Sequence, residues 1–155
     1  MEKKKDQKTS QTVYFTSIRL VREKEIPYEG GALKNAEKAY AFMKDFLEGK
    51  DRECFVTVAL DSRYFPTMVE ISAVGSSNKC FIEPREVFKL ALLANASSII
   101  CFHNHPSGKP EASWEDRILT KQLWEAGRML GITLNDHIII GDGCYFSFQE
   151  EGLFE

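Results

Sequence analysis

The sequence has no apolar run that approaches the ~20 residues a membrane-spanning helix requires, and it begins with polar residues rather than a signal-peptide stretch. It also lacks an excess of positive charge, because 20 Lys and Arg residues stand against 23 Asp and Glu residues, for a formal net charge of −3. We therefore expect a cytoplasmic protein with no membrane partner. Nucleic acid is a conceivable partner that this charge does not support.

The composition excludes a disordered chain, since 43% of the 155 residues are hydrophobic and 28% are charged. This length is enough for one compact domain and hardly enough for two. Residues 1–11 are polar and without periodicity, so we interpret them as a flexible tail that precedes a single domain over residues 12–155.

The four cysteines contain no Cys-x-x-Cys pair, and they lie far apart at Cys54, Cys80, Cys101 and Cys144. Three of them have apolar neighbours, which is typical of buried thiols in a core. The sequence therefore predicts neither a structural disulfide nor a cysteine-based zinc site.

Hydrophobic periodicity predicts strands and helices in alternation. Strands are expected at 13–21, 54–60, 67–74, 98–102, 133–140 and 145–148, with a short apolar stretch at 80–82; helices are expected at 36–48, 84–94 and 114–130. The third helix carries an apolar stripe of Trp114, Ile118, Leu123, Ala126 and Leu130. This order predicts a single three-layer α/β domain, a mixed sheet flanked by about three helices.

Two of the only three histidines, His103 and His105, lie at the end of a predicted strand. Side chains at i and i+2 of a strand point the same way, so both imidazoles can face one point. If Ser113 caps the following helix, Asp116 falls in its first turn. Two nitrogens and one oxygen with an open fourth position are the coordination of a catalytic zinc site, where the metal lowers the pKa of a water.

A structural alternative exists for each of these residues. The two histidines could be polar groups at a strand end, and Asp116 could be a capping carboxylate. The combination favours the metal site over these alternatives. The third histidine, His137, lies within an apolar strand and is interpreted as a structural residue rather than a fourth ligand.

The stretch 103–108, His-Asn-His-Pro-Ser-Gly, followed by Ser113-x-x-Asp116, resembles the JAMM metalloprotease signature and, more closely, the bacterial RadC family. The resemblance covers about residues 33–154, with one departure at Ala112, where the family usually has Pro. Further matches lie at 84–89, 95–96, 125–128, 130–132 and 136–143. Many RadC proteins carry an upstream helix-hairpin-helix segment, and we expect this chain to be a short form without it.

The resemblance implies a JAB/JAMM fold, similar to that of cytidine deaminases, and a zinc-dependent hydrolase. The activity implied is that of a metallopeptidase or isopeptidase acting on a peptide or protein substrate. His103, His105 and Asp116 would hold Zn²⁺, and Ser107 would stabilise the oxyanion of a tetrahedral intermediate.

By the same resemblance, a glutamate from an earlier strand would act as the general base on the zinc-bound water. We select Glu70, which lies in the predicted strand 67–74, for this role. Glu83 and Glu86 are weaker candidates, because they read as charges at the start of a helix.

Two other functions are considered. One is a role in DNA repair or recombination, which the family's name suggests and the acidic composition does not favour. The other is a non-catalytic interaction domain that retains the metal site. Cytidine deaminase chemistry is disfavoured, since the His-x-Glu and Pro-Cys-x-x-Cys motifs are absent. The oligomeric state is left open.

Overall fold

The computed structural model describes residues 11–75 and 82–154 and confirms an α/β architecture with a mixed five-stranded sheet. The elements are α1 (Ala36–Leu47), β1 (Cys54–Leu60), β2 (Pro66–Val74), α2 (Pro84–Leu93), β3 (Ser98–Asn104), α3 (Trp114–Leu130), β4 (Thr133–Ile140) and β5 (Tyr145–Ser147). The strand order is β2-β1-β3-β4-β5. The pair β3–β4 is parallel and the other three pairs are antiparallel.

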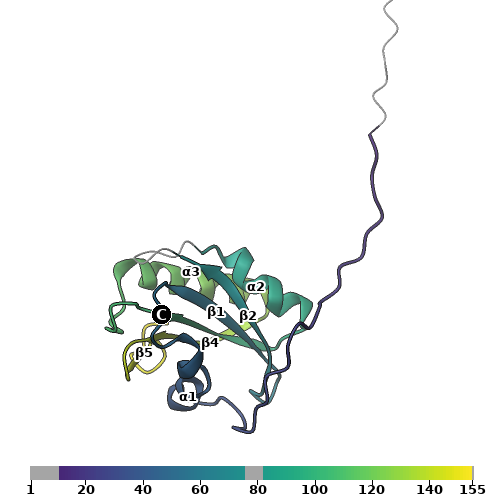
Figure 1. Ribbon diagram of the computed structural model, residues 1–155. Coiled ribbons are helices and arrows are strands. Elements are labelled where there is room, and N and C mark those ends of the chain that lie inside the picture. Colours follow the sequence, from purple (N-terminus) through teal and green to yellow (C-terminus); the bar gives the residue numbers. More distant parts are fainter. Residues whose placement is uncertain (1–10, 76–81, 155) are drawn as a thin grey trace, which may run out of the picture.

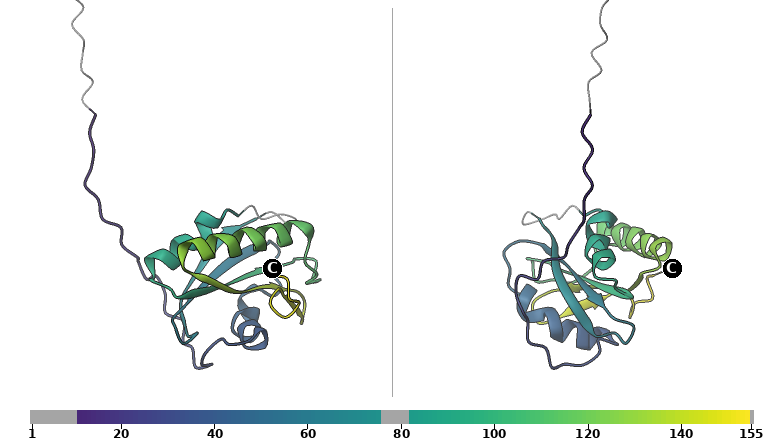
Figure 2. Two further views of the ribbon diagram at one scale, coloured as in Figure 1. Left: turned by 180° about the vertical axis from the view of Figure 1, so that it is seen from behind. Right: turned by 90° about the vertical axis from the view of Figure 1, so that its right-hand side faces the viewer.

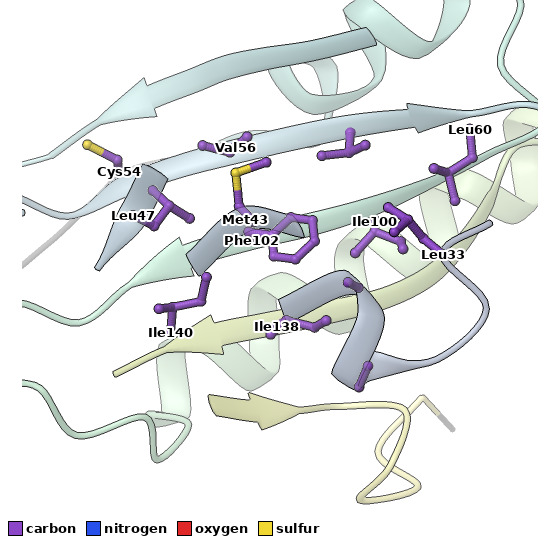
Figure 3. Close-up of a cluster of buried hydrophobic side chains, with 13 residues drawn as sticks. Leu33, Met43, Leu47, Cys54, Val56, Leu60, Ile100, Phe102, Ile138 and Ile140 are labelled. Atoms are coloured by element: carbon purple, nitrogen blue, oxygen red, sulfur yellow. The ribbon is translucent and has the colours of Figure 1, made fainter. Parts of the chain in front are cut away.

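The sheet is the middle of three layers (Figures 1 and 2), with α1 on one face and α2 and α3 on the other. On the α1 face, Met43 and Leu47 pack near Val56 and Phe102, as Figure 3 shows. The opposite face packs the next residues of β1 and β3, among them Phe55 and Cys101, against α2 and α3. The central strands are therefore buried on both sides, as their continuous apolar runs predict.

The helix ends match the signals in the sequence. Ser113 caps α3: its hydroxyl accepts the backbone N–H of Asp116, and the Asp116 carboxylate accepts the backbone N–H of Ser113. At the other end, Gly131 adopts a left-handed conformation with φ of 70° and terminates the helix. Within the described ranges, no helix is both long enough and apolar enough to cross a membrane.

The expected strand at 13–21 is wrong. The described residues 11–34 contain neither a helix nor a strand, and Val13, Phe15 and Ile18 are exposed. Alternating apolar residues make a strand only where a neighbouring strand supplies backbone hydrogen bonds, and this segment has no such neighbour within residues 11–75 and 82–154. Of the apolar stretch expected at 80–82, residues 80 and 81 lie outside the described residues.

The apolar stripe expected along α3 is also largely wrong. Trp114, Ile118 and Leu130 are exposed by 72%, 42% and 46%. Leu123 is buried as predicted, and Ala126 packs partly buried against the core. The other buried residues of the helix are Asp116, Thr120 and Gly127, which the stripe does not include. Hydrophobic periodicity misses this face because two of its residues are polar. Asp116 turns inward toward His103 at the end of β3, and Thr120 turns inward toward His137 in β4.

Candidate metal centre

Four side chains with metal-ligating atoms lie close together where β1 and α3 begin and β3 ends. They are Glu53, His103, His105 and Asp116, and one nitrogen or oxygen atom of each lies within 4.8 Å of the others. The start of β1 and the end of β3 supply three of them, and the first turn of α3 supplies the fourth. The structure thus brings together all three metal ligands predicted from the sequence.

The distances among the predicted ligands suit a small tetrahedral metal. The Nε2 atoms of His103 and His105 are 3.0 Å apart, and His103 Nε2 is 3.2 Å from Asp116 Oδ1. Ligand atoms bound at about 2.0 to 2.1 Å around a tetrahedral Zn²⁺ are separated by about 3.3 Å. The remaining pair, His105 Nε2 and Asp116, is 3.5 Å apart, measured to Oδ2. The three side chains therefore stand at nearly the spacing that this ion needs.

Glu53 is the fourth member of the group and was not predicted from the sequence. Its Oε1 atom is 3.6 Å from His103 Nε2 and 4.0 Å from His105 Nε2, so it stands farther out than the other three donors. Its side chain is only 12% exposed. This spacing is wider than the separation of about 3.3 Å between atoms bound to one tetrahedral ion.

The strand pairing explains how Glu53 reaches the histidines. β1 runs antiparallel to β3, and Phe55 lies opposite His103. The residue just before β1 therefore lies level with the end of β3. The signal available in the sequence was a glutamate directly preceding a buried strand, together with antiparallel pairing of that strand to the histidine strand.

Glu70, which we selected as the general base, is not in this group. It lies in β2 opposite Thr57, and the charges nearest to it include those of Lys89 and Glu86 on α2. Burial raises the pKa of its carboxyl. The structure therefore offers Glu53, rather than Glu70, as the glutamate beside the histidines.

Asn104 holds the backbone on both sides of Glu53. Its side-chain oxygen accepts the N–H of Cys54 at 2.8 Å, and its side-chain nitrogen donates to the carbonyl of Arg52 at 2.9 Å. Asn104 is itself buried, with 2% of its surface exposed. The amide between the two histidines thus fixes the approach of Glu53, a role that the sequence alone did not reveal.

Asp116 is oriented by the cap of its own helix. Both the backbone N–H and the hydroxyl of Ser113 donate to Asp116 Oδ2, at 2.8 and 2.6 Å. This leaves Oδ1 facing His103. Burial alone would raise the pKa of Asp116, but its contacts with His103, His105 and Ser113 hold it well below the usual range.

His105 is fixed by the loop that follows β3. Its Nδ1 lies 2.8 Å from the carbonyl oxygen of Lys109, so this nitrogen carries the proton and Nε2 presents a lone pair to the group. Burial would lower the pKa of His105, but Asp116, the Lys109 carbonyl and Glu53 together raise it. The histidine is therefore held in the orientation that a metal ligand needs.

The same loop is attached to the end of β4. The backbone carbonyl of Gly108 accepts the backbone N–H of Asp142 at 2.8 Å. The backbone N–H of His105 donates to the backbone carbonyl of Ile140 at 3.0 Å. Gly141 permits this close approach, because a Cβ at that position would lie 2.5 Å from the Gly108 oxygen. The position of His105 thus depends on the hairpin between β4 and β5.

Ser107 lies in the turn just after His105. Its side chain is exposed, and its oxygen accepts the N–H of Lys109 at 3.4 Å. The hydroxyl oxygen is the acceptor in this contact, so the hydroxyl proton is not used by it.

His137 contacts His103 directly, although the two are 34 residues apart. His137 Nε2 is 2.8 Å from His103 Nδ1, and His137 Nδ1 is 2.7 Å from the Thr120 hydroxyl. The ring is completely buried, and this burial lowers its pKa well below the ordinary value. It is not one of the four grouped side chains but lies directly behind one of them.

Comparison with known proteins assigns the family. The family model of the RadC-like JAB domain matches residues 33–153. A UPF0758 protein of Shouchella clausii is 43% identical over 122 residues, which are 79% of this chain and 53% of that protein. UPF0758 proteins of Methanosarcina acetivorans and Trichlorobacter lovleyi are 46% and 45% identical over 73% and 75% of this chain.

These matches cover 49% and 50% of the last two proteins, so the chain spans about half the length of the curated relatives it matches. The observed sheet and its three helices agree with a JAB-type domain. The match over residues 33–153 includes all four side chains of the metal centre, and the chain belongs to the RadC family.

Proposed function

We propose that this chain is a zinc-dependent hydrolase that cleaves peptide or isopeptide bonds. The observation that carries the proposal is the arrangement of two imidazole nitrogens and one carboxylate oxygen at 3.0 and 3.2 Å, with a second carboxylate at 3.6 Å. Three protein ligands and an open fourth position distinguish catalytic zinc sites from closed structural ones. Imidazole and carboxylate ligands are also a donor set that suits zinc.

In this proposal His103, His105 and Asp116 hold the ion. A zinc ion bound there would lower the pKa of a water toward neutrality. Glu53 stands just beyond the three ligands, where its carboxylate would serve as the general base and would pass the proton to the leaving amine. Ser107 is the proposed donor to the negative charge that develops on the substrate carbonyl oxygen.

The peptide or protein substrate is inferred from this chemistry and from the JAB domain, and it is part of the proposal. The cytoplasmic location is likewise a prediction. A domain that holds metal without catalysis is the alternative outcome, and the separation of Glu53 from the ligands argues for catalysis. A closed structural site would use Glu53 as its fourth ligand at the spacing of the other donors, whereas its oxygen stands 3.6 and 4.0 Å from the two histidine nitrogens.

The proposal is tested by metal analysis and a cleavage assay on purified protein. We expect about one zinc per chain at neutral pH, and loss of zinc in His103→Ala and Asp116→Ala. Glu53→Gln should retain zinc and lose cleavage of peptide and isopeptide-linked substrates, while the matched variant Glu70→Gln should retain both. Absence of bound transition metal in the wild type, or full cleavage by Glu53→Gln, would contradict the proposal.

A further inference from the structure

A chain of three short hydrogen bonds runs from the back of His103 to the backbone of α3. His103 Nδ1 is 2.8 Å from His137 Nε2, and His137 Nδ1 is 2.7 Å from the Thr120 hydroxyl. The Thr120 hydroxyl in turn lies 2.6 Å from the backbone carbonyl of Asp116. This series of hydrogen bonds thus starts on the side chain of one predicted metal ligand, His103, and ends on the backbone of another, Asp116.

The direction of each bond follows from counting protons. A carbonyl oxygen only accepts, so the single proton of the Thr120 hydroxyl goes to Asp116. The hydroxyl oxygen must then accept from His137, which places a proton on His137 Nδ1. The two hydrogen bonds of the Thr120 hydroxyl are therefore satisfied together only when His137 carries a proton on Nδ1.

The surroundings of His137 keep its ring neutral. It is fully buried, stacked on Phe148 with ring centroids 5.1 Å apart, and 5.3 Å from the ring of Phe55. Neither of its two hydrogen-bond partners is a carboxylate. With its proton on Nδ1, a neutral ring has a lone pair on Nε2 and accepts the Nδ1–H of His103.

We propose that Thr120 and His137 are positioning residues that fix the proton of His103 on Nδ1 and so keep Nε2 free for a metal ion. This inference rests on the proposed metal site. Histidine ligands commonly donate their second N–H to a carboxylate, a carbonyl or a water. His105 follows that rule with the carbonyl of Lys109, whereas His103 donates to a second imidazole.

The arrangement predicts what happens when the hydroxyl is removed. In Thr120→Val a proton on His137 Nδ1 would be buried without an acceptor, which is costly. The proton therefore moves to Nε2 and is donated to His103 Nδ1. A neutral His103 must then carry its own proton on Nε2, 3.2 Å from Asp116 Oδ1, where it blocks the ligand position.

The first test measures zinc affinity by competition with a coloured chelator. Loss of support behind a ligating histidine typically lowers metal affinity by about 10- to 100-fold, and we expect this loss for Thr120→Val. Thr120→Ser keeps the hydroxyl and should bind zinc as the wild type does. Equal affinities of the valine and serine variants would overturn the inference.

The second test needs neither metal nor catalysis. Nitrogen NMR of ¹⁵N-histidine-labelled, metal-free protein at about pH 8.5, above the ordinary histidine pKa, reports which ring nitrogen carries the proton. The wild type should show Nδ1–H on His103 and on His137, and Thr120→Val should show Nε2–H on both. Wild-type His103 protonated on Nε2 would overturn the inference, even if the valine variant failed to fold.

The two tests separate this inference from the proposed function. If the wild type binds no zinc but shows the expected protons, the metal site fails and the hydrogen-bond chain stands. If zinc binds and Thr120→Val changes neither affinity nor proton positions, the metal site stands and the positioning role fails.

Discussion

The side-chain oxygen of Asn104 accepts a 2.8 Å hydrogen bond from the backbone nitrogen of Cys54, and this bond joins the end of β3 to the start of β1. With the second bond from Asn104 to Arg52, it holds both peptide groups that flank Glu53. The proposed general base thus takes its position from the residue between the two histidines. The backbone carbonyl of Glu53 itself accepts the N–H of Gly75 at 2.8 Å, so Asn104 adds to a contact with the end of β2.

Substitution of Asn104 should therefore separate catalysis from metal binding. Asn104→Ala removes both bonds, and we expect cleavage to fall about 100-fold, because a shift of about 1 Å in a catalytic group costs this much. Zinc content should be unchanged, and stability should fall by about 1 to 3 kcal/mol for the two unsatisfied backbone groups. Kinetic assays with metal analysis and chemical unfolding measure the three effects.

A matched control is Asn135→Ala, which also removes a side-chain amide bond, here to the Ser98 hydroxyl near the other end of β3. It should leave cleavage at the wild-type level. An equal loss of activity in the two variants would show that Asn104 acts only through stability.

Removal of the metal should lower the thermal stability of the wild type. An ion that binds only the folded chain stabilises it by about 2.7 kcal/mol when present at 100 times its dissociation constant. A chelator should therefore lower the melting temperature of the wild type but not that of His103→Ala, measured by calorimetry. An identical shift in both proteins would mean that the chelator acts elsewhere.

Metal affinity should weaken as the pH falls. Burial lowers the pKa of His105, but its contacts with Asp116, Lys109 and Glu53 outweigh burial and raise it above 6.5. Below that raised pKa, zinc must displace a proton from the ligand, so affinity should fall about tenfold per pH unit for each proton displaced. Calorimetric titration between about pH 6 and pH 8 tests this; a pH-independent affinity would exclude His105 as a ligand.

Ionisation of Asp136 should lower the free energy of unfolding as the pH rises from about 4 to about 6. Burial raises its pKa to about 6, although the hydroxyl of Ser147 and the backbone N–H groups of His137 and Gln149 oppose this. The folded state then binds the proton more tightly than the unfolded state, whose carboxyl titrates near 3.8. Stability from this group is complete below about pH 4 and is lost by about pH 6, about 3 kcal/mol in all.

Asp136→Asn keeps the side-chain shape and removes the titration. The difference in unfolding free energy between the variant and the wild type should grow in favour of the variant from pH 4 to pH 6. Urea unfolding at several pH values measures this difference. A constant difference across the range would contradict the raised pKa.

The sequence predicted those features that depend on neighbouring residues. The two histidines share a side because they are two residues apart in a strand, and Asp116 is placed by the local cap at Ser113. Glu53 was missed because its position depends on the pairing of β1 with β3, whose residues are about 50 apart in the chain. The partners of His137 were missed for the same reason.

The errors in secondary structure have related causes. The segment 13–21 has the alternation of a strand but no neighbouring strand among the described residues. The face of α3 was misplaced because Asp116 and Thr120 are polar, and a pattern based on hydrophobicity assigns such residues to solvent. In this helix the inward polar residues mark the site.

The central claim is that His103, His105 and Asp116 hold a metal ion while Glu53 stands beside it. Anomalous diffraction at the zinc absorption edge, from crystals of the zinc-loaded protein, tests this most directly. We expect one peak about 2.0 to 2.2 Å from the Nε2 atoms of both histidines and from Asp116 Oδ1, with the Glu53 carboxylate beyond bonding distance. No peak at this position, or an ion bound directly by Glu53 and not by Asp116, would contradict the account.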